Sequence, residues 1–142
     1  ESEIDFAKTL TRKENAKFID CWVKSKDKGF YSIPYNYRPG THPQQKQFNP
    51  DFIIKKANKI IFVETKHDED TDVKNRDKIA GANDYFVELN AKVENKGQEN
   101  YFYFLTPADY TGFFQNVIRN NKTFIGELHA ELLKKNREEL KN

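Results

Sequence analysis

The 142-residue chain contains one cysteine, no methionine, three histidines, six glycines and five prolines. A single cysteine, Cys21, excludes an internal disulfide and a cysteine-based zinc site, so we expect a reducing, cytoplasmic setting and a core thiol at this position. No apolar run approaches the roughly 20 residues that a membrane helix needs, so we expect no membrane association. Because the chain starts at Glu1 and lacks methionine, we also expect it to belong to a longer protein.

No charge of one sign dominates the chain. Its 24 basic and 22 acidic residues leave a net charge of +2, which excludes a strongly basic arm and a disordered polyelectrolyte. Hydrophobic residues make up 37% of the chain and include 12 Phe, 7 Tyr and 1 Trp, which is enough for one core. We therefore expect residues 1–142 to form a single globular domain.

The periodicity of apolar residues predicts an α/β fold in which helices flank a mixed sheet. The first helix is expected over residues 2–24, either continuous or broken near Thr11, and residues 36–47 read as a long polar loop. The remaining expected elements are a strand over 30–35, strands over 52–56 and 60–66, a helix over 73–89, a strand over 101–105, and helices over 109–119 and 124–140.

Three residues stand out as a candidate catalytic group: Asp51, Glu64 and Lys66. Glu64 and Lys66 are two apart on one expected strand and so project from the same face. If the strands over 52–56 and 60–66 form an antiparallel hairpin with a two- or four-residue loop, Asp51 falls opposite Glu64. A three-residue loop instead puts Asp51 on the other face.

Two adjacent carboxylates and an ammonium at the end of an apolar strand are typical of a metal-dependent phosphodiesterase. Like charges repel, so the pair is ionised only with a cation, and all-oxygen ligands favour Mg²⁺, for which Mn²⁺ substitutes. Lys66 is then placed to orient the attacking water and help it lose a proton, or to stabilise negative charge as the phosphorane forms. The simpler alternative is a turn at Asp51 and a solvated surface pair at Glu64 and Lys66.

The segments Asn49-Pro50-Asp51-Phe52-Ile53-Ile54 and Ile61-Phe62-Val63-Glu64-Thr65-Lys66 resemble the two motifs of the PD-(D/E)XK nuclease superfamily. The likeness is closer to the C-terminal endonuclease domain of type III restriction enzyme Res subunits. Three further segments support it: residues 2–10 are similar to that family's opening helix, Ser32-Ile33-Pro34 to its strand before the PD motif, and residues 75–82 to its following helix. A departure is the stretch 36–47, which is longer than the usual link.

This resemblance implies a restriction-endonuclease-like fold, with a central mixed four-stranded sheet and helices on both faces. It also implies Mg²⁺ ligation by Asp51, Glu64 and the carbonyl oxygen of Thr65, with Lys66 acting on the water. An acid from the first helix commonly completes the site; Glu3 is preferred and Glu14 is the rival. The implied partners are double-stranded DNA, a helicase domain of the same chain that uses ATP, and a modification methyltransferase subunit.

Four residues are candidates for nucleic-acid contact: Tyr37, Arg38, Lys46 and Lys78. The first three lie in the expected loop, where aromatic and basic groups mix with His42. A surface excursion without function is the alternative for the loop, and a solvent-facing lysine is the alternative for Lys78. The acidic stretch 67–72 is expected to be a solvated loop rather than a second metal site. A catalytically idle nuclease fold that binds nucleic acid or a partner is the alternative function.

Overall fold

The computed structural model describes residues 2–25, 31–38, 42, 44–67, 73–93 and 96–141. The helical elements are α1 (Ser2–Thr11), α2 (Lys13–Ala16), α3 (Val73–Val93), η2 (Pro107–Asp109), α4 (Tyr110–Phe113), η3 (Phe114–Ile118) and α5 (Glu127–Lys141). The strands are β1 (Cys21–Lys24), β2 (Ile33–Tyr37), β3 (Gln44–Phe48), β4 (Phe52–Lys56), β5 (Lys59–Thr65) and β6 (Glu99–Leu105). This order of helices and strands makes the protein a mixed α/β structure.

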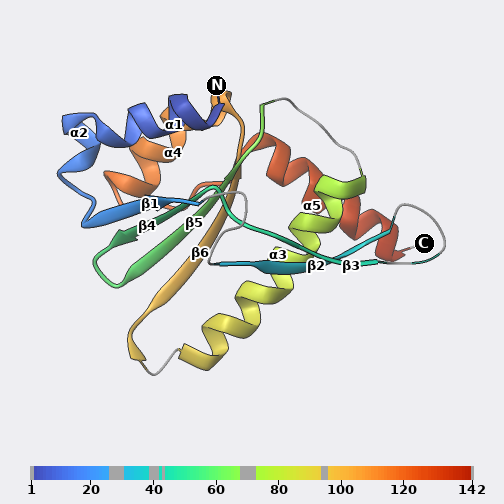
Figure 1. Cartoon of the computed structure of the whole chain (residues 1–142). Coiled ribbons are helices and arrows are strands. Elements are labelled where there is room, and N and C mark those ends of the chain that lie inside the picture. The colour runs from blue at the N-terminus through green and yellow to red at the C-terminus, as the bar shows by residue number, and fades with distance from the viewer. Residues whose placement is uncertain are drawn as a thin grey trace.

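A four-stranded mixed sheet forms the centre of the molecule, with the strand order β1-β4-β5-β6. β4 runs antiparallel to both β1 and β5, whereas β6 runs parallel to β5. α1 and α4 cover one face and α3 covers the other, as Figure 1 shows. The expected α/β class, the four-stranded mixed sheet and the helices on both faces are therefore confirmed.

The face of the sheet toward α1 carries the larger apolar core. Phe6 and Leu10 of α1 are fully buried, and the Phe6 ring lies 4.7 Å from that of Phe52 on β4. Alternate residues of the strands point into this core, as period-two alternation requires. The strand members of the core are Phe52, Ile54, Ile61, Val63, Tyr103 and Leu105. This packing attaches the N-terminal helix to the end of the sheet where the candidate residues lie.

β2 and β3 form a separate antiparallel pair, the β2–β3 ribbon, which lies across α3 (Figure 1). Its buried residues Ile33, Tyr35 and Phe48 pack with Ala82 and Phe86 of α3. The expected loop over 36–47 is therefore wrong for the described residues, which are largely strand. The reason is that β3 buries only Phe48, so its polar sequence hides its strand conformation.

Residues 21–24 form an edge strand, so the expectation of a continuous helix over residues 2–24 is wrong. The alternative break near Thr11 is confirmed, since α1 ends there and the short α2 ends at Ala16. Trp22 and Val23 then pair with Ile54 and Ile53 of β4, because sheet pairing outweighs the helical spacing of these apolar residues. Cys21 is exposed, so the expected core thiol is also wrong.

None of the helices in the described part of the chain is long and apolar enough to cross a lipid bilayer.

Gly81 is the point of closest approach between α3 and the ribbon, so we predict that Gly81→Ala destabilises the fold. A Cβ atom there lies 2.5 Å from Tyr35 Cβ and 2.7 Å from the Pro34 carbonyl oxygen. We expect a loss of about 1–3 kcal/mol in the free energy of unfolding, larger than the gain of about 1 kcal/mol from helix propensity. Urea denaturation measures it. Asn83→Ala, exposed on the same helix, should leave stability unchanged or slightly higher.

Candidate active site

The hairpin of β4 and β5 determines which side chains meet at the end of the sheet. Lys55 pairs with Ile60 and Lys56 with Lys59, so the turn is the two residues Ala57 and Asn58. The predicted register is confirmed, and Asp51 lies opposite Glu64, directly beyond the last pair of Phe52 with Val63. Ala57 has a positive φ of 53°, and Asp20 supports the turn by accepting a hydrogen bond of 2.9 Å from the Ala57 backbone N–H.

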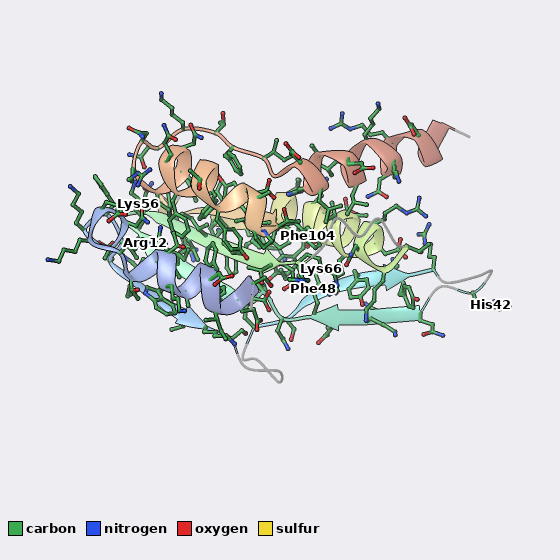
Figure 2. The ribbon with its side chains drawn as sticks, turned by 90° about the horizontal axis from the view of Figure 1, so that it is seen from above. Arg12, His42, Phe48, Lys56, Lys66 and Phe104 are labelled. Atoms are coloured by element: carbon green, nitrogen blue, oxygen red, sulfur yellow. The ribbon has the colours of Figure 1, made fainter. Side chains whose placement is uncertain are left out.

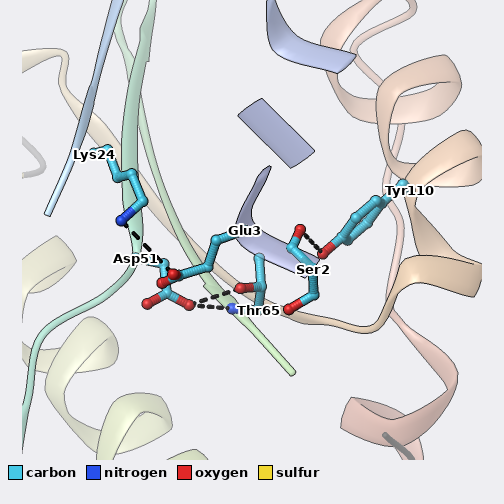
Figure 3. Close-up of polar contacts among 6 residues, drawn as sticks. All are labelled: Ser2, Glu3, Lys24, Asp51, Thr65 and Tyr110. Carbon is cyan, nitrogen blue, oxygen red and sulfur yellow. Dashed lines mark hydrogen bonds and ion pairs between the residues drawn. The ribbon is translucent and has the colours of Figure 1, made fainter. Parts of the chain in front are cut away.

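Asp51 is held by β5 through two hydrogen bonds. The Thr65 backbone N–H donates to Asp51 Oδ2 at 2.7 Å, and the Thr65 hydroxyl donates to the same oxygen at 2.8 Å (Figure 3). The Ser25 N–H, in turn, donates to the Asp51 carbonyl oxygen at 2.8 Å. The carboxyl group is therefore fixed in position, with its second oxygen outside these contacts.

The first helix brings Glu3 to Asp51, and not its rival Glu14. The Glu3 side chain lies beside that of Asp51, and the Lys24 ammonium lies 3.6 Å from Glu3 (Figure 3). Glu14 lies exposed on α2, beyond the other end of α1. Tyr110 holds the start of α1 in place by donating from its hydroxyl to the Ser2 carbonyl oxygen at 2.9 Å.

Glu64 pairs with Lys78 from α3, at 3.2 Å between Oε2 and Nζ. The two side chains are only 10% and 15% exposed, so the ion pair lies largely out of water. Within the described part of the chain, the other carboxylate oxygen, Oε1, is buried and has no hydrogen-bond partner. A buried carboxylate oxygen without a partner is costly, and a cation or a bound water is the usual remedy.

Lys66 follows β5 directly and donates its backbone N–H to the Leu105 carbonyl oxygen at 2.8 Å. Its ammonium charge acts on Glu64 and favours the ionised carboxylate, though less than that of Lys78 does. Two lysines, one at the end of β5 and one on α3, thus act electrostatically on the single buried carboxylate of Glu64. Sequence reasoning anticipated the first, and left the second open between phosphate contact and a solvent-facing side chain.

All three carboxyl groups of the cluster have raised pKa values. Burial raises the pKa of Glu64, with Lys78 opposing it, and burial followed by the Glu64 charge raises the pKa of Asp51. The pKa of Glu3 is raised mainly by side-chain hydrogen bonding with Asp51, and then by burial. Burial and neighbouring like charge thus disfavour the charged form of these carboxyl groups, and the nearby lysines only partly oppose them.

The donor set fits a hard divalent cation held by few protein ligands. Among the residues that the structure describes, no three His, Cys, Asp or Glu side chains form a group able to hold a metal ion by themselves. Two carboxylates with backbone and water oxygens are the usual environment of Mg²⁺, which keeps several waters. Asp51 and Glu64 supply the carboxylates, and Thr65 supplies the adjacent backbone.

The other candidate residues for nucleic-acid contact lie on the ribbon. Lys46 Nζ is 4.7 Å from the centre of the Tyr37 ring, and the exposed Arg38 donates its backbone N–H to Asp77 Oδ2 at 2.7 Å. Figure 2 shows His42 at the outer end of the ribbon, while Phe48, at its inner end, precedes Asp51 by three residues. Most of the acidic stretch, residues 68–72, lies outside the described residues.

Two residues that contact the cluster were not anticipated: Lys24, which pairs with Glu3, and Tyr110, which anchors α1. Lys24 was assigned to a helix, so nothing placed it beside the PD segment. Tyr110 is 108 residues from Ser2, and no local pattern indicates such a contact.

Comparison with known proteins yields no relative: no protein-family model, no curated protein and no solved structure matches the chain.

The raised carboxyl pKa values predict a pH dependence that Asp51→Asn removes. A carboxyl whose pKa is higher in the folded chain contributes stability below its unfolded pKa, about 4, and that contribution is lost as pH rises through the folded pKa. The metal-free unfolding free energy of the wild type should therefore fall relative to Asp51→Asn as pH rises above about 4. Urea titrations in EDTA from pH 4 to 8 measure this difference.

Added Mg²⁺ should reverse the effect at neutral pH in the wild type but not in Asp51→Asn, which lacks one of the proposed metal ligands. Asp20→Asn is the matched control, because hydrogen bonds from Ala57 and Lys55 lower the pKa of Asp20 and give the opposite slope. A constant stability difference between wild type and Asp51→Asn across this range contradicts the assigned pKa direction.

We predict that Lys78→Met destabilises the metal-free chain by about 3 kcal/mol near neutral pH, because it leaves Glu64 buried without a counter-ion. Protonation of Glu64 at lower pH should recover part of the loss, as should Mg²⁺ or Mn²⁺. Thermal and urea unfolding with and without metal measure both effects. Lys92→Met, which breaks an exposed pair with Glu88 on the same helix, should cost less than about 0.5 kcal/mol.

Proposed function

We propose that the chain is a Mg²⁺-dependent DNA endonuclease domain with a restriction-endonuclease-like fold. The observation that carries the proposal is the convergence of Asp51, Glu64 and Lys66 at one end of the mixed sheet, with one oxygen of Glu64 buried and unpartnered in the described chain. The four-stranded mixed sheet with helices on both faces agrees with that fold type. The acid at the start of α1, beside Asp51, agrees with it as well.

The assigned roles follow from the contacts. Asp51 and Glu64, with the Thr65 carbonyl oxygen, would hold Mg²⁺, which polarises a phosphate oxygen and neutralises developing charge. Lys66 orients the attacking water and helps it lose a proton, and Lys78 stabilises the ionised Glu64. Glu3 keeps Asp51 in position and holds a proton that metal binding releases.

The substrate and partners are proposed from the resemblance of the Asp51 and Glu64 segments to the motifs of the PD-(D/E)XK nuclease superfamily. Hydrolysis of a phosphodiester bond in a duplex needs a cation, a positioned water and stabilisation of the charge on the phosphate, and the residues of this cluster would provide for each. A helicase motor that uses ATP, elsewhere in a longer chain, and a methyltransferase subunit would deliver the DNA in a type III restriction system. The net charge of +2 suits a domain that depends on such delivery rather than on its own affinity.

The test is Mg²⁺-dependent nicking of supercoiled plasmid by the purified 142-residue chain. We expect Asp51→Asn and Glu64→Gln to reduce cleavage to background while the fold is retained. Lys66→Ala should lower the rate by about 10²-fold or more with little change in metal affinity, as expected for a group that moves a proton. Glu88→Ala and Lys92→Ala, exposed on α3, are the matched controls and should cut at the wild-type rate.

Metal affinity is measured separately, by Mn²⁺ titration with EPR detection. Cleavage by Glu64→Gln at the wild-type rate, or an unchanged rate in Lys66→Ala, contradicts the assigned roles. A wild-type chain that binds Mn²⁺ and DNA but never cuts favours the idle-module alternative.

A further inference from the structure

We propose that the outer face of the β2–β3 ribbon contacts base edges in the major groove of duplex DNA, next to the phosphate that is cut. This inference rests on the proposed function and adds to it a groove-contacting element. We call its three carboxamide side chains, Asn36, Gln45 and Gln47, the amide face. The structure, rather than the sequence, reveals this face, since the same residues read as an irregular loop in the sequence.

The strand register assigns these three residues to one face of the ribbon. Asn36 is directly opposite Gln45, and Gln47 is opposite Pro34, two residues further along β3. Cross-strand partners share a face, and residues two apart on a strand share it too. All three carboxamides are exposed, and none has a hydrogen-bond partner among the described residues. Their donors and acceptors are therefore available to a ligand.

The opposite face of the ribbon fixes it to the body of the molecule. Ile33, Tyr35 and Phe48 are buried there, and Tyr35 lies so close to Gly81 that no Cβ fits between them. The Phe48 ring also lies 5.3 Å from Lys78 Nζ, so the ribbon contacts the residue that pairs with Glu64. A ribbon held on α3 in this way presents its amide face in a fixed relation to the candidate active site.

The chemistry of the amide face matches adenine. The carboxamide of Asn or Gln donates to adenine N7 and accepts from adenine N6 in a bidentate pair, and the major groove is wide enough for a two-stranded ribbon. A protein partner is less well matched, because interface cores are rich in apolar and aromatic groups, whereas the described residues of this face are carboxamides and Pro34.

Charge along the segment also favours DNA. The sequence has no Asp or Glu between Asp27 and Asp51, in a chain where acidic residues nearly equal basic ones. Arg38 directly follows β2, two residues after Asn36, and is exposed, so its charge is suited to a phosphate beside the groove.

The short segment between Gln47 and Asp51 limits the distance between the amide face and the candidate active site. Gln47 precedes Asp51 by four residues, so their Cα atoms are at most about 14 Å apart. One DNA strand rises about 3.4 Å per nucleotide. The bases that Gln47 contacts should therefore lie within roughly four to six nucleotides of the phosphate at the Asp51 end of the sheet.

The test is fluorescence anisotropy with 20-base-pair duplexes and the 142-residue chain, in EDTA at low salt. Three probes are compared: an A·T-rich duplex, a G·C-rich duplex, and the A·T-rich duplex with 7-deazaadenine, which lacks the N7 acceptor. We expect wild type to prefer the A·T-rich duplex and to lose at least about fivefold in affinity on 7-deaza substitution. The variant Asn36→Ala/Gln45→Ala/Gln47→Ala should show neither effect, and Gln115→Ala, an exposed glutamine on η3, should behave as wild type.

Several outcomes overturn the proposal. If 7-deazaadenine changes wild-type affinity by less than twofold, or lowers wild-type and triple-variant affinity equally, the amide face does not read N7. This probe modifies the DNA, so it decides the question even if the triple variant unfolds. Plasmid cleavage in Mg²⁺ by wild type, with no 7-deaza effect, refutes only the ribbon contact. A 7-deaza effect without any cleavage refutes only the nuclease function.

Discussion

The register of the β4–β5 hairpin is the constraint on which the candidate site depends. A two-residue turn places Asp51 opposite Glu64, and a slip of one residue would turn every side chain of one strand to the other face of the sheet. The turn holds this register with a non-glycine residue at positive φ, Ala57, at some cost in backbone energy. Asp20, from the segment before β1, offsets that cost by accepting the Ala57 N–H.

Once the register brings the carboxylates together, the rest of the molecule has to compensate their charge. Two lysines do so: Lys78 of α3 pairs with Glu64, and Lys24 of β1 pairs with Glu3, the third carboxyl group, which α1 places beside Asp51. This compensation is incomplete, because the pKa values of all three carboxyl groups are still raised and one Glu64 oxygen has no partner in the described chain. A cation that binds the folded chain at such a site would stabilise it.

α3 links the site to the ribbon. Lys78, near the start of α3, pairs with Glu64, and Gly81 on the same helix allows β2 to pack closely against it. Because a movement of α3 would shift both, the geometry between carboxylates and amide face is set by the packing of a single helix. A substitution that moves this helix should therefore affect the proposed metal affinity and the proposed DNA contact together.

Local chemistry was sufficient to predict the hairpin, its register and the acidic pair, because alternation along a strand and the length of one turn specify which side chains share a face. The sequence by itself also determined the α/β class and both buried strands of the centre. Only tertiary structure decided that residues 21–24 pair with β4, that residues 44–48 pair with β2, and that Lys78 and Tyr110 reach the site. In each of these cases the deciding contact joins segments distant in the chain, and the local sequence is compatible with a helix, a loop or a solvent-facing side chain.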